Sequence, residues 1–140
     1  MRYPFILLIA FAFFSCKDLE IVRYEYSTST QMGRTVLAVT QDSVIVTFNG
    51  RGEPSYWARE TKEGEWESLN ASMQDVDLSK VSSLEAPSNG RMTDRAPIAK
   101  FNFVGKDSSI SSAPFDAGKP HEMLSPLMEV FSKIEEVNKL

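Results

Sequence analysis

The 140-residue sequence contains a single cysteine, Cys16, and a single histidine, His121. A zinc site built from several cysteine and histidine ligands is therefore excluded, and no second cysteine is available for an intramolecular disulfide. The sequence also lacks a Gly-x-Ser-x-Gly motif and a glycine-rich loop of the kind that cradles phosphate. We expect a fold that is stabilised by its core alone, with no cofactor and no metal site.

Long hydrophobic runs are missing as well, since the longest apolar run, Phe5–Phe14, has only ten residues. At about 1.5 Å per residue, a helix of this length spans about half of the ~30 Å hydrocarbon core, so a permanent transmembrane helix is not expected. The run follows Arg2 and ends just before Ser15 and Cys16, where the sequence becomes polar. This layout is typical of a secretory signal peptide, and we predict that residues 1–15 are removed.

The junction at Cys16 resembles the lipobox of bacterial lipoproteins, which implies that its thiol is acylated, for instance by palmitate, and becomes the first mature residue. Phe13 and Phe14 before Ser15 are similar to the signals of Bacteroidota lipoproteins, and Lys17–Glu20 resembles the export signal of their surface lipoproteins. The resemblance implies a lipid anchor in the cell envelope, on the periplasmic or surface side of the outer membrane. The alternative is an ordinary signal peptide followed by an incidental cysteine.

Removal of residues 1–15 leaves 125 residues, which is the size of one domain. We expect residues 16–19 to form a lipidated tether and residues 20–140 to form a single domain. The mature chain has 14 basic and 19 acidic residues, so its net charge is near −5, and the basic residues are scattered. This pattern argues against nucleic-acid binding and against a polybasic membrane-binding patch, so the lipid on Cys16 would be the membrane contact.

Alternating apolar and polar residues predict strands over 19–26, 34–40, 43–48, 55–60, 99–103 and 109–115. Gln41 and Asp42 are expected to form a two-residue hairpin turn, and residues 27–33 a polar loop. Because buried parallel strands are continuously apolar, the alternation favours an antiparallel sheet.

Two amphipathic segments predict helices. Within residues 62–75, Trp66, Leu69 and Met73 recur three and four residues apart, and Thr61 is the expected N-cap. A shorter turn capped by Asp77 should follow it.

The second helix is predicted over residues 126–138, after a turn over 120–124, because Pro126 is acceptable as a first helical residue. This segment has the strongest helical periodicity of the chain, through Leu127, Val130, Phe131, Ile134 and Val137. The predicted fold class is therefore α+β, an antiparallel sheet of five or six strands with two helices packed on one face.

The order of these elements, together with the Asp116–Pro120 approach to the last helix, resembles small uncharacterised lipoproteins of Flavobacteria-like organisms. The resemblance implies no particular activity.

Polar residues gather in the two loops that flank the last two predicted strands. Arg91, Asp94 and Arg95 lie in the first loop, and Asp116 and His121 lie in the second. If the strands form a simple hairpin, the loops are close together and form a polar binding notch. The alternative interpretation is that these charged residues only solvate and stabilise the loops.

Aromatic residues offer a second candidate site. Trp57 with Tyr24, Tyr26 and Tyr56 would form an exposed binding platform, whereas residues at strand spacing more often cover a core or a sheet edge.

These features favour a non-catalytic module that binds an envelope protein or a glycan near the membrane, rather than an enzyme. The alternative is a small envelope hydrolase that uses the carboxylates of Asp94 and Asp116, with His121 as proton carrier. This alternative requires the three side chains to converge in one pocket.

Overall fold

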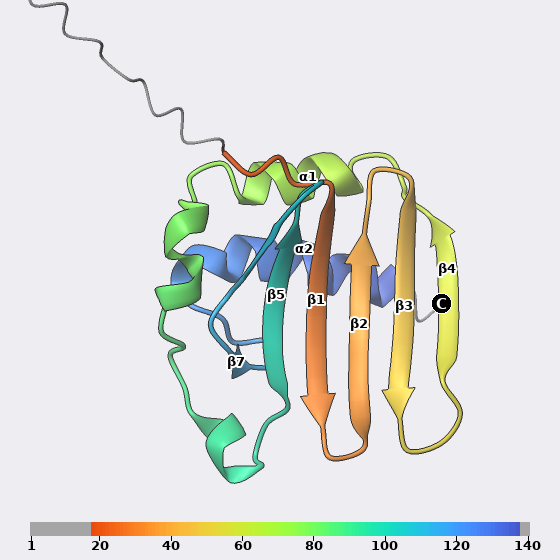
Figure 1. The fold of residues 1–140 in the computed structure, drawn as a ribbon, viewed down its shortest axis with the longest axis vertical. Coiled ribbons are helices and arrows are strands. Elements are labelled where there is room, and N and C mark those ends of the chain that lie inside the picture. The colour runs from red at the N-terminus through yellow and green to blue at the C-terminus, as the bar shows by residue number, and fades with distance from the viewer. Residues whose placement is uncertain (1–17, 138–140) are drawn as a thin grey trace, which may run out of the picture.

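A computed structural model describes residues 18–137 of the chain (Figure 1). The predicted signal peptide and the predicted acylation site at Cys16 lie outside these residues. The fold is α+β, with an antiparallel sheet and two main helices, so the fold class predicted from the sequence is confirmed. Among the described residues, no helix is long and apolar enough to cross a membrane.

The sheet has the strand order β4-β3-β2-β1-β5-β6, and β7 also pairs with β5. All pairings are antiparallel. The first four strands form a meander, and β5 then returns to lie beside β1 (Figure 1). The strands are β1 (Arg23–Thr30), β2 (Gly33–Val39), β3 (Ser43–Gly50), β4 (Ser55–Glu60), β5 (Ile98–Val104), β6 (Ser109–Ser111) and β7 (Phe115–Asp116).

Strand β1 lies further along the chain than predicted. It was expected over residues 19–26 with a polar loop over 27–33, but it extends to Thr30. The Ser- and Thr-rich segment is a strand because β1 is central and pairs with β2 on one side and β5 on the other. These pairings satisfy its backbone groups, which the local pattern of polar residues does not reveal.

The β1–β2 turn consists of Gln31 and Met32, and Gly33 opens β2 against the end of β3. A Cβ on Gly33 would lie 2.6 Å from the backbone oxygen of Asn49, and its φ of 153° also disfavours a side chain. Glycine therefore permits the close backbone approach at this end of the sheet.

The predicted strand over 109–115 is in fact two short strands, β6 and β7. Between them the Ser112 hydroxyl accepts a hydrogen bond from the Phe101 amide at 3.0 Å, and Pro114 has no amide hydrogen for a ladder bond. A side-chain bond and a proline thus interrupt the strand.

The helices are α1 (Glu65–Ser72) and α2 (Ser125–Val137), with 3-10 turns η1 (Leu78–Ser83), η2 (Gly90–Thr93) and η3 (Glu122–Leu124). The prediction that Thr61 caps α1 is wrong, because its hydroxyl donates to the Thr40 carbonyl and Gly64 occupies the N-cap. The Asp77 cap is confirmed, since its carboxylate accepts the Ser79 amide.

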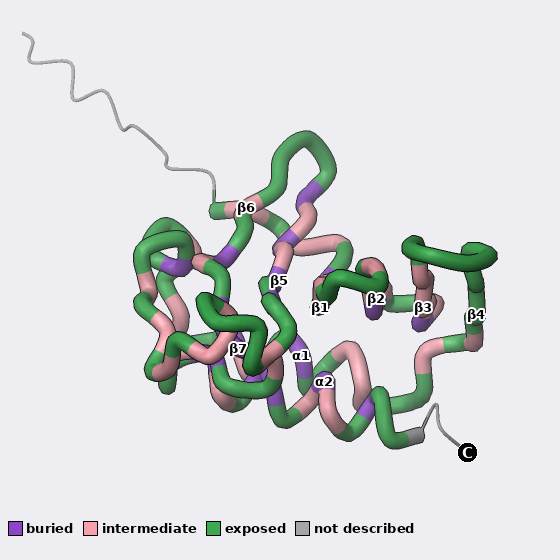
Figure 2. The backbone as a smooth tube through the Cα atoms, turned by 90° about the horizontal axis from the view of Figure 1, so that it is seen from below, coloured by how far each residue is buried: buried purple, intermediate pink, exposed green. Residues whose placement is uncertain are grey.

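Both helices lie on one face of the sheet, and the core lies between the two layers (Figure 2). Fully buried rings of Tyr24, Phe101, Phe103 and Phe131 dominate it. The helix α1 is shorter than the predicted 62–75, and Met73 is its C-cap. The predicted apolar stripe is confirmed, because Leu69 and Met73 are buried and Trp66 packs against the ring of Tyr24. The core therefore fixes the positions of the loops at the two ends of the sheet.

Candidate functional site

The carboxylate of Asp116 on β7 organises the loop that contains η2. Its Oδ2 accepts hydrogen bonds from the Ser88 hydroxyl and the Gly90 amide at 2.6 and 2.7 Å. Its Oδ1 accepts the Arg91 amide at 2.8 Å and the Arg91 guanidinium at 3.3 Å. The same guanidinium donates to the Ser88 carbonyl at 2.5 Å, so loop and strand are fastened together.

This hydrogen-bonded group around Asp116, which we call the anchor, is largely shielded from water, since the side chains of Asp116 and Arg91 are 5% and 10% exposed. Hydrogen bonds, first from the Ser88 hydroxyl and then from the Arg91 amide, hold the pKa of Asp116 well below its ordinary range, although burial opposes them. The carboxylate therefore stays ionised and keeps all four donors. Its role in the structure is to hold the loop in one conformation.

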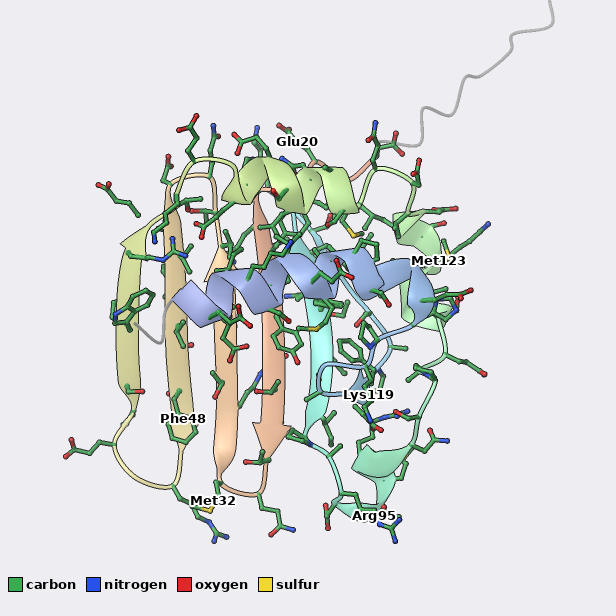
Figure 3. All side chains as sticks on the ribbon, turned by 180° about the vertical axis from the view of Figure 1, so that it is seen from behind. Glu20, Met32, Phe48, Arg95, Lys119 and Met123 are labelled. Carbon is green, nitrogen blue, oxygen red and sulfur yellow. The ribbon has the colours of Figure 1, made fainter. Side chains whose placement is uncertain are left out.

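Beside this anchor lies a groove of about 510 Å³, which we call the distal notch. It is lined by residues 29–32, 91 and 94–98. Asp94 has a left-handed backbone conformation, with φ of 53°, and its carboxylate accepts a hydrogen bond from Gln31 at 3.5 Å. The loop of η2 and the β1–β2 turn thus meet across the notch, and Figure 3 shows Met32 and Arg95, which both line it, at the same end of the sheet.

Of the five residues of the predicted polar notch, the structure brings four together and places His121 elsewhere. Arg91, Asp94 and Arg95 line the distal notch, and Asp116 supports it from behind. His121 does not line the notch. It is the N-cap of η3, where its Nδ1 accepts a hydrogen bond from the Met123 amide at 3.2 Å.

The convergence that a carboxylate hydrolase needs is not found around the distal notch. Asp94 lines the notch, whereas Asp116 has both oxygens engaged by backbone, serine and arginine donors, and neither it nor His121 lines this groove. Within residues 18–137, no three His, Cys, Asp or Glu side chains are grouped so that they could hold a metal ion.

The exposed aromatic platform, one of the two interpretations of these residues, does not form. Tyr24 and Tyr26 are buried in the core, and burial raises the pKa of Tyr24 to about 12. Tyr56 and Trp57 are exposed, but as adjacent residues of β4 they point to opposite faces of the sheet. Trp57 is on the face that carries the helices, because it pairs with Val46 in the row of the buried Tyr26 and Leu37.

Sequence reasoning did not identify Ser88 and Gly90 as partners of Asp116, nor Gln31 and Met32 as part of the notch. Ser88 and Gly90 belong to the segment Pro87–Gly90, which leads into η2, and a serine and a glycine amide there are typical donors to a distant carboxylate. The contribution of the β1–β2 turn depends on strand order, which the sequence pattern does not specify.

No protein-family model matches the chain, and no curated protein shows significant similarity to it.

Proposed function

We propose that this protein is a lipid-anchored, non-catalytic binding module of the bacterial cell envelope, attached through Cys16 to the outer membrane. The proposal is supported chiefly by the position of the distal notch relative to the tether. The described chain enters β1 at one end of the sheet, and the notch lies at the other end (Figure 1). The eight residues of β1 span about 26 Å between these ends.

The segment before β1 is held against the domain. The Val22 amide donates to the Val104 carbonyl at 2.8 Å, and Leu19 packs against the core. Lys106 also contacts Glu20 at 3.6 Å. A lipid on Cys16 would therefore hold this end close to the membrane and leave the distal notch facing other envelope molecules.

The chemistry of the distal notch suits a protein partner. Met32 and Ile98 are exposed at its rim. Met92 is exposed on η2, next to Arg91, which lines the notch. Methionine is an adaptable contact residue, and methionine and arginine are enriched at protein interfaces. Because Asp116 already fixes the loop, binding would cost little ordering entropy.

Anchoring is tested by labelling cells with a clickable fatty acid. The wild-type chain should incorporate the label and sediment with membranes, because the Cys16 thiol is the acylation site of the resembled lipobox. Cys16→Ser should incorporate none and should be released from membranes or remain unprocessed. A wild-type chain without label would contradict the anchor.

Binding at the distal notch is tested by introducing a photo-crosslinking amino acid at Met92 in the full chain. We expect a covalent adduct with a protein in intact cells. The matched control carries the crosslinker at Asp107, near Glu20 at the tether end, and should not give this adduct. Equal adducts from both positions, or none from Met92, would contradict the proposed partner surface.

A further inference from the structure

A second concavity, which we call the helix groove, lies between α2 and the sheet and has a volume of about 320 Å³. Its floor includes Tyr26, Thr28 and Thr35, and its roof includes Met128, Ser132 and Glu135 from α2. Figure 3 shows α2 crossing the sheet well away from Phe48, so the helix leaves that end of the sheet uncovered. The volume is at the small end of the range for ligand sites, about 300–1,000 Å³.

The register of the strands arranges this face of the sheet in two rows that run across β1 to β4. One row contains Tyr26, Leu37, Val46 and Trp57, and the next contains Thr28, Thr35, Phe48 and Ser55. The first row is apolar and ends at Trp57, which is 41% exposed. From the second row, Thr28 and Thr35 line the groove and supply hydroxyl groups. An occupant of the groove would therefore meet an apolar strip and a polar strip side by side.

The groove contains hydroxyl groups that the protein does not satisfy. Tyr26 is only 8% exposed, and its hydroxyl oxygen accepts the Gly118 amide at 3.2 Å. Within residues 18–137 its hydroxyl hydrogen has no acceptor, and the hydroxyls of Thr28, Thr35 and Ser132 have no partner. Of these four residues only Tyr26 is buried, and a ligand oxygen would supply the acceptor that its hydroxyl hydrogen lacks.

The charge of the helix groove selects against anions. Of the described residues that line it, none is lysine or arginine, and one is the acidic Glu135. The pKa of Tyr26 is raised mainly by burial, with a further contribution from the negative charge of Glu135, while the Gly118 hydrogen bond opposes them. A phosphate or carboxylate in the groove would meet this negative charge without a compensating cation.

We propose that the helix groove binds a neutral hexose unit of a glycan. A hexose has hydroxyls that both donate and accept hydrogen bonds, which suits the hydroxyls of Tyr26, Thr28, Thr35 and Ser132. Its apolar C–H face suits the strip formed by Leu37 and Val46. Trp57, directly across from Val46, stands where the next sugar unit of the glycan would stack on an aromatic ring. This site is separate from the distal notch and does not depend on the lipid anchor.

Binding is tested with the full chain in an amine-oxide detergent, which has no sugar headgroup. Cellobiose, maltose and diacetylchitobiose are each titrated to about 50 mM, while the Trp57 indole and the Thr28 and Thr35 amides are followed by NMR. We expect saturable shifts for at least one disaccharide, with a dissociation constant of about 1 mM or lower. The absence of saturable shifts for all three would overturn the proposal.

The hydroxyl contacts are tested by Thr28→Val and Thr35→Val, which keep the side-chain shape. Each should weaken binding of the responding disaccharide about tenfold, because a ligand hydroxyl loses its partner. Thr47→Val is the matched control, since Thr47 pairs with Val36 and Tyr56 on the opposite face of the sheet and should leave binding unchanged. Melting curves of all three variants confirm folding. Affinities for Thr28→Val and Thr35→Val equal to wild type would overturn the assignment.

Two further measurements distinguish the charge and class of the occupant. Glucose should bind more tightly than glucuronate, and Glu135→Gln should narrow that difference; equal binding of both sugars by the wild type would count against the groove. NOEs from the detergent alkyl chain to the methyls of Thr28 and Thr35 would assign the groove to an acyl chain and overturn the carbohydrate proposal.

Discussion

Phe131→Ala is expected to lower the free energy of unfolding by about 3–5 kcal/mol, which is typical for removing a large core aromatic side chain. Phe131 is fully buried on α2, and its ring lies 5.7 Å from that of Phe101 and 5.8 Å from that of Tyr26. Its loss would leave a cavity between the helix and the central strands. This loss is a large fraction of the total stability of a domain of this size, which is about 5–15 kcal/mol.

Chemical denaturation followed by circular dichroism measures this effect. Glu129→Ala is the matched control, because Glu129 is exposed on the same helix and its replacement should change stability by less than about 0.5 kcal/mol. A Phe131→Ala chain that unfolds at the wild-type denaturant concentration would show that α2 does not contribute to the core.

Glu65→Gln should destabilise the fold by about 3 kcal/mol, because it breaks an ion pair that is largely shielded from water. The Arg59 guanidinium contacts both oxygens of Glu65 at 2.7 and 2.6 Å, and the two side chains are 14% and 13% exposed. Glu65 also accepts the Lys62 amide at 2.8 Å. One carboxylate thus ties the edge strand β4 to the start of α1.

The effect of Glu65→Gln should depend on pH. Burial raises the pKa of Glu65, but the hydrogen bonds from Arg59 and Lys62 outweigh it, so the folded-state pKa is below the ordinary value. The stabilisation is therefore complete above the unfolded pKa of about 4.3 and is lost as the pH falls through the folded pKa. The difference between wild type and variant should be largest near pH 7 and shrink in acid.

Thermal melts of wild type, Glu65→Gln and Glu67→Gln, recorded from pH 7 down to below the unfolded pKa of about 4.3, provide the measurement. Glu67 is an exposed residue of the same first helical turn, so its variant serves as the control. Equal melting temperatures for wild type and Glu65→Gln at pH 7 would show that the ion pair adds nothing to stability.

The two proposed surfaces differ in how they are built. The distal notch is formed by loops and depends on the Asp116 carboxylate, so its geometry should fail if that anchor is lost. The helix groove is formed by paired strands and by α2, whose residues are held by the core. A partner at the notch and a sugar in the groove could therefore bind independently.

Local patterns in the sequence were enough to predict most of the elements. The alternation in β2, β3, β4 and β5 and the periodicity of α2 identified those segments within about two residues, because side chains at these spacings share a face. The Asp77 cap was also predictable, since it depends on residues two positions apart. The α+β fold class follows from these elements together.

Prediction was less successful where a distant partner decides the local structure. Ser27–Thr30 has the composition of a loop, but it is a strand because β2 pairs with it and β5 pairs with Ser27–Ser29 from about 70 residues away. Thr61 donates to Thr40 instead of capping α1 for the same reason. Non-local pairing overrides local propensity in both cases.

The sequence by itself determined the resemblance of the Cys16 junction to a lipobox, the presence of only one cysteine and one histidine, and the pattern of an antiparallel sheet with two amphipathic helices. Only the tertiary structure decided that Asp116 and Ser88 meet, that His121 lies outside the notch, and that hydroxyls of β1, β2 and α2 share one groove. The physical reason is that spacing along the chain determines which face a side chain occupies, whereas strand order and helix packing determine what lies opposite it.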